Sequence, residues 1–158
     1  MTTILGFYRG RQSKSLGSRF LAWWQRHDCS HVVVVKALGT FDMRVADATL
    51  LHGVRANRWT KFDPSLWVFY LVPADASMVH GWFAANDGAK YDLFGLLGFV
   101  LKRIRGSPRA WWCTEAVAQA AAYPDPWRWD VAFMDVHARL VGRRLDADAV
   151  KAILWAVR

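Results

Sequence analysis

The chain has 158 residues, 54% of them hydrophobic and 15% aromatic, which predicts one domain with a substantial apolar core and excludes a disordered chain. Its formal net charge of +8 favours an anionic partner. The basic residues are scattered, without zinc-ligand spacing, an aromatic RNA-binding signature or a clear helix-turn-helix, so we expect no nucleic-acid partner. Bacterial wall polymers and membrane surfaces are also anionic and stay open as partners.

No apolar run reaches the roughly 18 residues that a membrane span requires, so no transmembrane segment is expected. At the N-terminus a short apolar piece precedes the charges, the reverse of a secretory signal, and synthesis in the cytoplasm is expected. The two cysteines, Cys29 and Cys113, are expected to be reduced, because a chain of this size does not need a disulfide. The sequence leaves open whether they can be bridged under oxidation.

The first third of the chain predicts a β-hairpin that carries a histidine and an acid. His31 precedes four consecutive valines, a run of β-branched residues typical of a buried central strand. Antiparallel pairing with the next predicted strand lets Asp47 accept a hydrogen bond from the His31 imidazole. His52, at the end of the Asp47 strand, is a rival for the role of base or orienting group. In chain order we expect a strand over residues 4–8, a loop over 10–15, an amphipathic helix over 18–25, the histidine strand over 30–35, a turn over 39–42 and the Asp47 strand over 43–51.

The rest of the chain predicts two more strands followed by helices, without internal repeats. This order of elements indicates an α+β fold in which a small antiparallel sheet packs against helices. The expected strands cover residues 54–60 and 66–72, the helices 75–85, 91–101, 113–122, 129–140 and 146–157, the basic connector 102–109 and the rigid loop 123–126.

Cys113 stands at the predicted start of one of these helices. There it faces backbone N–H groups without intrahelical partners and the positive end of the helix dipole, which favour a thiolate over a thiol. A thiolate catalyst also needs a histidine base and a group that orients the base, and His31 and Asp47 are the candidates. The alternative is that Cys113 is a small buried core residue. No His, Cys, Asp and Glu residues have the spacing of metal ligands, so neither a metal nor another cofactor is expected.

Four segments carry a recognisable pattern: residues 30–35 (Ser-His-Val-Val-Val-Val), 44–54, 91–99 (beginning Tyr-Asp-Leu-Phe-Gly) and 112–118 (beginning Trp-Cys-Thr-Glu). Together they resemble the NlpC-type papain-like cysteine hydrolases, in the circularly permuted, YiiX-like branch often met in bacteriophage genomes. Thr114 replaces the usual serine of that family, and Asp47 stands where relatives more often carry histidine, glutamate or another polar group. The resemblance covers roughly residues 4–122, so the helices within 124–158 are expected to be specific to this protein.

This resemblance implies a single permuted papain-like domain over residues 1–158, with Cys113 as nucleophile, His31 as base and Asp47 as the group that orients it. It implies a cysteine amidohydrolase or peptidase that cleaves peptide or amide bonds in bacterial peptidoglycan, associated with phage tail proteins and acting at the cell wall. One alternative is a thiol hydrolase or acyltransferase acting on lipid, because the permuted fold is also similar to lecithin retinol acyltransferase-like proteins. Another is a non-catalytic structural or adaptor protein of the virion.

Overall fold

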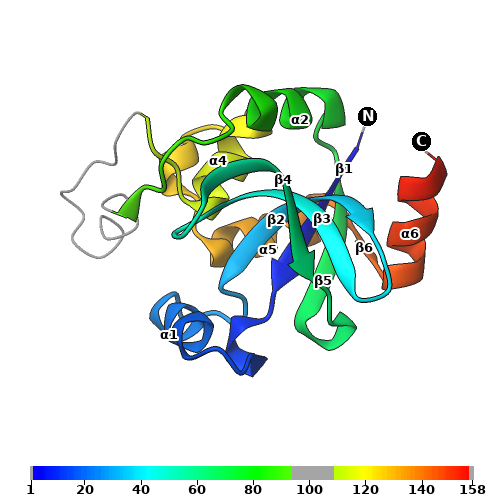
Figure 1. Cartoon of the computed structure of the whole chain (residues 1–158), viewed down its shortest axis with the longest axis horizontal. Helices are drawn as coiled ribbons and strands as arrows, with labels where there is room; N and C mark the ends of the chain where they lie inside the picture. The colour runs from blue at the N-terminus through cyan, green and yellow to red at the C-terminus, as the bar shows by residue number, and fades with distance from the viewer. Residues whose placement is uncertain (1, 94–108, 157–158) are drawn as a thin grey trace.

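The valine-rich stretch after His31 forms the centre of a six-stranded antiparallel sheet in the computed structural model, which describes residues 2–93 and 109–156 (Figure 1). The strand order is β4-β3-β2-β1-β5-β6, and each neighbouring pair is antiparallel. The strands are β1 (Thr3–Tyr8), β2 (His31–Leu38), β3 (Asp42–Thr49), β4 (Gly53–Lys61), β5 (Trp67–Val72) and β6 (Arg143–Leu145).

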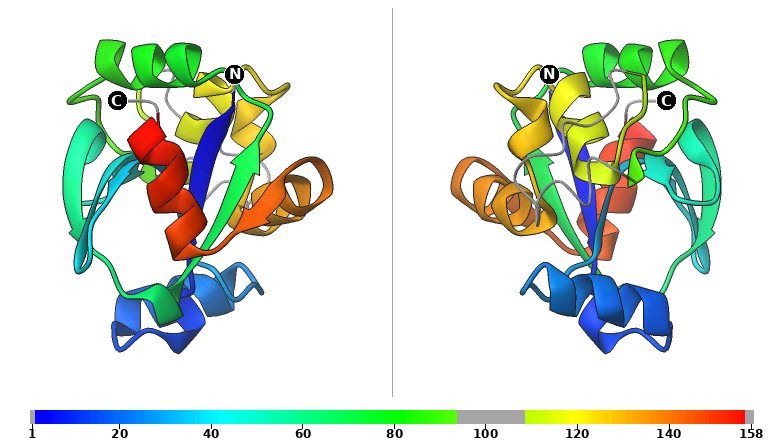
Figure 2. Two further views of the ribbon diagram at one scale, coloured as in Figure 1. Left: turned by 90° about the vertical axis from the view of Figure 1, so that its right-hand side faces the viewer. Right: turned by 90° about the vertical axis from the view of Figure 1, so that its left-hand side faces the viewer.

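Five α-helices occur in the described part of the chain, and four of them pack on the two faces of this sheet. Figure 2 shows α5 and α6 on opposite sides of β1. The helices are α1 (Leu16–Trp24), α2 (Ala76–Ala85), α4 (Cys113–Ala120), α5 (Val131–Val141) and α6 (Ala147–Ala156), and short 3-10 turns are η1 (Gly10–Gln12), η2 (Pro64–Leu66) and η3 (Pro126–Arg128). The predicted α+β class, with an antiparallel sheet packed against helices, is confirmed.

The alternating side chains of β2 explain why its apolar run is continuous. Val32 and Val34 belong to the core formed with α2, α4 and α5, whereas Val33 and Val35 belong to the core formed with α6. All four are at most 2% exposed. A strand covered on both faces needs apolar residues at successive positions rather than at alternate ones. The strand that begins with His31 is therefore held firmly at the middle of the molecule.

One segment differs from the sequence-based expectations, and two predicted segments cannot be compared with the structure. Residues 143–145 form β6, an edge strand of three residues whose two arginines are exposed, and no strand was predicted there. Its apolar pattern is too short to distinguish it from a loop. The predicted helix over 91–101 and basic connector over 102–109 lie almost entirely outside the described residues. Among the described helices, none is both long and apolar enough to cross a membrane.

The helices after residue 124 are part of the core. Met134 and Ala138 of α5 pack in the cluster that contains Cys113, and Val150 of α6 packs in the cluster on the other face. All three side chains are fully buried. The segment expected to be specific to this protein is therefore integral to its fold.

Candidate functional site

Helix α4 begins at Cys113, and side chains around its first turn hold that start in place. The indole Nε1 of Trp112, the N-cap residue, donates to Thr114 Oγ1 at 2.8 Å, and the Thr114 hydroxyl donates to the carbonyl of Trp129. The carboxylate of Glu115, the third helical residue, accepts the backbone N–H of Trp112, as in one half of a capping box. The nucleophile candidate thus stands on a helix start fixed by buried hydrogen bonds.

The hydrogen bonds of Thr114 give a testable expectation for this helix start. Thr114→Val keeps the shape of the side chain but removes the hydroxyl, which leaves the buried Trp129 carbonyl with fewer donors. We expect the free energy of unfolding to fall by about 1–3 kcal/mol, measured by denaturant unfolding. Thr114→Ser keeps the hydroxyl and serves as the control, with a smaller loss. Equal losses in the two variants would show that the hydroxyl is not what stabilises the turn.

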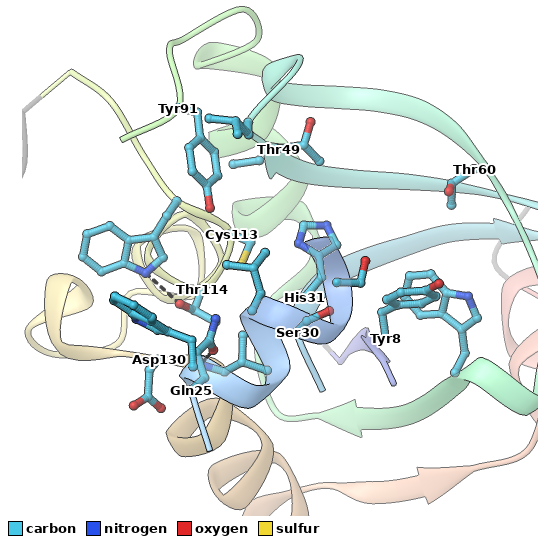
Figure 3. Close-up of a pocket in the computed structure, with 18 of the residues that line it drawn as sticks. Tyr8, Gln25, Ser30, His31, Thr49, Thr60, Tyr91, Cys113, Thr114 and Asp130 are labelled. Carbon is cyan, nitrogen blue, oxygen red and sulfur yellow. Dashed lines mark hydrogen bonds between the residues drawn. The ribbon is translucent and has the colours of Figure 1, made fainter. Parts of the chain in front are cut away.

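Cys113 and His31 face each other in a cavity of about 560 Å³ (Figure 3). The Cys113 sulfur lies beside the His31 ring, close enough for its charge to raise the pKa of that ring, although the two residues come from a helix and a strand far apart in the chain. Cys113 is only 5% exposed, and its exposed part lies in this cavity. The structure therefore brings the predicted nucleophile and the predicted base together at one solvent-accessible point.

Asp47 contacts the other side of the His31 ring, as the hairpin prediction requires. Because β2 and β3 pair with Val34 opposite Ala46, His31 and Asp47 lie diagonally across the ladder on the same face. His31 Nε2 is 3.0 Å from Asp47 Oδ2, so Nε2 carries the proton and donates it. That tautomer leaves Nδ1 for the Cys113 sulfur.

Arg58 is a fourth member of the row of side chains formed by Cys113, His31 and Asp47, and it was not predicted from the sequence. Its Nε donates to Asp47 Oδ1 at 3.0 Å, and its Nη2 donates to Oδ2, which makes a bidentate pair. A β-bulge between β3 and β4 shifts the register beside Val45 and brings Arg58 to Asp47. Bulges leave no reliable mark in a single sequence, so no pattern pointed to this arginine.

The pKa values of Asp47 and His31 follow from these contacts. Burial by itself raises the pKa of Asp47, which is fully buried, but hydrogen bonds from His31 and Arg58 outweigh it and hold the pKa below its usual value. Burial by itself lowers the pKa of His31, but Cys113 and Asp47 together raise it to about 10. The favoured state at neutral pH is therefore an imidazolium held between a sulfur and a carboxylate.

Two further titratable side chains lie close to the sulfur. Tyr91 lines the cavity, and Figure 3 shows its hydroxyl pointing toward Cys113. Burial, and then the charge of Cys113, raise the pKa of Tyr91, so its hydroxyl keeps its proton and can donate it in a hydrogen bond. Burial raises the pKa of Glu115 to about 7. The sequence placed Tyr91 in a family motif without assigning it a role.

His52 and Cys29 lie apart from this arrangement. His52 is exposed in the turn between β3 and β4 and is not part of the cavity lining, so Asp47, not His52, is the group on His31. Cys29 is a free cysteine, as is Cys113, and the two belong to the same hydrophobic cluster. Burial, followed by the charge of Asp135, raises the pKa of the Cys29 thiol to about 12. Cys29 is therefore a packed, unreactive thiol at neutral pH.

Within residues 2–93 and 109–156, no three His, Cys, Asp or Glu side chains are grouped so as to hold a metal ion. Comparisons with protein-family models, with curated proteins and with solved structures give no match to this chain. The site consists of a sulfur at a helix start, a histidine, a buried carboxylate and an arginine that binds this carboxylate through two hydrogen bonds.

Proposed function

We propose that the chain is a cysteine hydrolase that cleaves peptide or amide bonds, with a permuted papain-like arrangement of its catalytic residues. The observation that carries the proposal is the continuous line from Cys113 through His31 to Asp47 at the wall of a solvent-accessible cavity. A packed core cysteine would not need a charged histidine whose second nitrogen is bound to a buried carboxylate. Such an arrangement is what nucleophilic catalysis by a thiolate requires.

In the proposed reaction, the Cys113 sulfur attacks the carbonyl carbon of the substrate. The tetrahedral intermediate collapses when His31 gives its Nδ1 proton to the leaving amine, and a thioester to Cys113 remains. Water then attacks the thioester while His31 takes a proton from it at Nδ1. The carbon–sulfur bond breaks and the carboxylic acid leaves, which restores the Cys113 thiolate and the protonated His31. Asp47 keeps the ring oriented throughout, and Arg58 keeps Asp47 ionised and in place.

The intermediate places a negative charge on the former carbonyl oxygen, which needs donors. The backbone N–H of Cys113, at the start of α4, is one donor, and the Tyr91 hydroxyl is the second in this proposal. A phenol suits this role because its high pKa keeps the proton on the oxygen throughout turnover.

The Tyr91 role can be tested by removing a single oxygen. Tyr91→Phe is expected to lower kcat by about 10²-fold with little change in KM, because the lost hydrogen bond forms mainly in the transition state. The matched control is Tyr123→Phe, since the Tyr123 hydroxyl is buried without a hydrogen-bond partner among the described residues and lies outside the cavity lining. A Tyr91→Phe protein with wild-type kcat would remove Tyr91 from the mechanism.

Bacterial peptidoglycan is the substrate we propose. The cavity is lined by Arg26 and Lys61, which suit a substrate that carries carboxylates, as the stem peptides of peptidoglycan do. The chain's net charge of +8 also suits an anionic wall, where a phage tail component would act. Purified peptidoglycan should be digested by the wild-type protein, and the masses of the soluble products identify the bond that is cleaved. Undigested peptidoglycan after prolonged incubation would count against this substrate.

A second candidate, hydrolysis or acyl transfer on lipid, is favoured by the apolar part of the cavity. Leu21, Trp24 and Leu50 line it beside the basic side chains, and Leu50 is 63% exposed. Such a mixture suits an acyl chain joined to an anionic headgroup. The same Cys113 mechanism applies with an alcohol as the leaving group. Incubation with lipid esters in parallel with peptidoglycan distinguishes the two substrates.

A further inference from the structure

Helix α1 lies at one end of the molecule, away from the body of the sheet (Figures 1 and 2). One face of this helix is apolar and exposed to solvent. Leu16, Phe20 and Trp23 follow one another at helical spacing on the same side and are 78%, 52% and 65% exposed. Ala22 is the helix's fully buried residue. An exposed, contiguous apolar face of this kind marks an interaction surface in a soluble protein.

The aromatic side chains of α1 form a cluster on this surface. The Phe20 ring lies 5.9 Å from the Trp23 ring and 5.6 Å from the Trp24 ring, measured between centroids. Clustered tryptophan and phenylalanine side chains are typical of helices that lie in the boundary between lipid headgroups and acyl chains. The face is therefore suited to a lipid surface in shape and in residue type.

The charge around α1 has one dominant sign. Between residues 9 and 28 the sequence has five basic residues and a single acid, Asp28, which pairs with Arg11 at 3.2 Å. Lys14, Arg19 and Arg26 are exposed close to the apolar face. Basic side chains beside an apolar helical face add electrostatic attraction to anionic lipid phosphates. This charge favours a phospholipid surface over an uncharged apolar partner.

We infer that α1 docks on the surface of an anionic phospholipid bilayer, with Leu16, Phe20 and Trp23 at the headgroup boundary and the basic residues on lipid phosphates. Leu21 and Trp24 of the same helix line the cavity, so docking brings the mouth of the cavity to the membrane surface. The inference goes beyond the proposed function and does not depend on it, because it uses none of the catalytic side chains.

Vesicle co-sedimentation tests the docking separately from catalysis. The wild-type and Cys113→Ala proteins should both sediment with vesicles that contain phosphatidylglycerol. Both should bind vesicles of phosphatidylcholine alone at least about tenfold more weakly, and added salt should weaken binding to the anionic vesicles. Phe20→Ser combined with Trp23→Ser should weaken binding at least about tenfold. That double variant should still act on a soluble substrate at the wild-type rate, because neither residue lines the cavity.

The control is Trp155→Ser, which removes an exposed tryptophan, 78% accessible, from α6 at the far side of the molecule (Figure 1). This variant should bind vesicles as the wild type does. Lys14→Glu combined with Arg19→Glu should abolish the preference for phosphatidylglycerol. Equal binding to both vesicle types, or equal binding by the Phe20/Trp23 variant and the wild type, overturns the inference. A dimer in solution that the Phe20/Trp23 variant converts to monomer also overturns it, because a second copy then covers the face.

Discussion

Cys113→Ala is expected to abolish hydrolysis, with kcat at least about 10⁴-fold below that of the wild type, because the proposed mechanism has the Cys113 sulfur as its nucleophile. The change removes only a sulfur from a buried position, so the thermal unfolding temperature should stay close to that of the wild type. The rate at which a peptide or a peptidoglycan fragment is hydrolysed, followed by the masses of the products, measures kcat. Calorimetry measures the thermal unfolding temperature. A Cys113→Ala protein that hydrolyses substrate at the wild-type rate would end this mechanism.

Selective alkylation gives an independent check on Cys113, and Cys29 is the matched control. Both are buried free cysteines, but Cys113 borders the cavity beside His31, whereas burial raises the pKa of Cys29 to about 12. Iodoacetamide near neutral pH should therefore add one group, located at Cys113 by mass spectrometry of its peptides. Cys29→Ala should leave both labelling and turnover unchanged. Labelling of Cys113 only after denaturation would support a packed core cysteine, as in a non-catalytic virion protein.

Asp47→Asn is the second change with a large expected effect. It keeps the size of the side chain but removes the charge that orients the His31 ring and favours its protonated form. We expect kcat to fall by about 10²–10⁴-fold, because the base then adopts the wrong tautomer or orientation. The variant should also unfold more easily, since Arg58 loses its bidentate partner. Steady-state kinetics over a range of pH, with denaturant unfolding alongside, separate these two effects.

The chain contains a matched control for Asp47→Asn in a second buried aspartate. Asp135 is 1% exposed and contacts His27 Nε2 at 3.2 Å and Arg139 Nη2 at 2.6 Å, the same three residue types away from the cavity lining. Asp135→Asn should lower stability but leave kcat close to the wild-type value. Equal losses of kcat in the two variants would show that buried ion pairs matter only for folding here.

The sign of the pH dependence follows from the raised pKa of His31. Folded His31 keeps its proton up to a pH of about 10, whereas an unfolded histidine loses it near 6.5. Its contribution to the free energy of unfolding is therefore complete below pH 6.5 and is lost as the pH rises toward 10. Activity should fall over the same alkaline range, because a neutral His31 cannot protonate the leaving amine. In Asp47→Asn this alkaline limb should move to lower pH.

The paired residues of the hairpin could be predicted from the sequence because they depend on local rules. Four valines after His31 define a buried strand, and the period of two along the next strand places Asp47 within reach of the imidazole. The position of Cys113 at the start of α4 also follows from local pattern. These features depend on periodicity and on helix ends, which neighbouring residues largely determine.

The remaining parts of the site depend on contacts that neighbouring residues do not determine. Arg58 reaches Asp47 through a bulge, where one extra residue reverses which side chains face the site. Tyr91 follows α2 in the chain, and it reaches the cavity because its side chain packs against the core beside Cys113. The edge strand β6 forms because β5 offers it a partner, not because three residues prefer a strand. Tertiary packing decides all three positions.

Strands β2, β3 and β4 are adjacent both along the chain and across the sheet. One part of the site is therefore synthesised, and its residues are close in sequence, before the other part is made. His31, Asp47 and Arg58 come from these three strands, so short loops are enough to bring them together. Contacts between segments close in sequence form at a lower entropic cost than those between distant ones. Cys113 is synthesised later and must dock from α4. During synthesis His31, Asp47 and Arg58 are therefore all present before the sulfur, and under the proposed mechanism the chain stays inert until α4 has been made and packed.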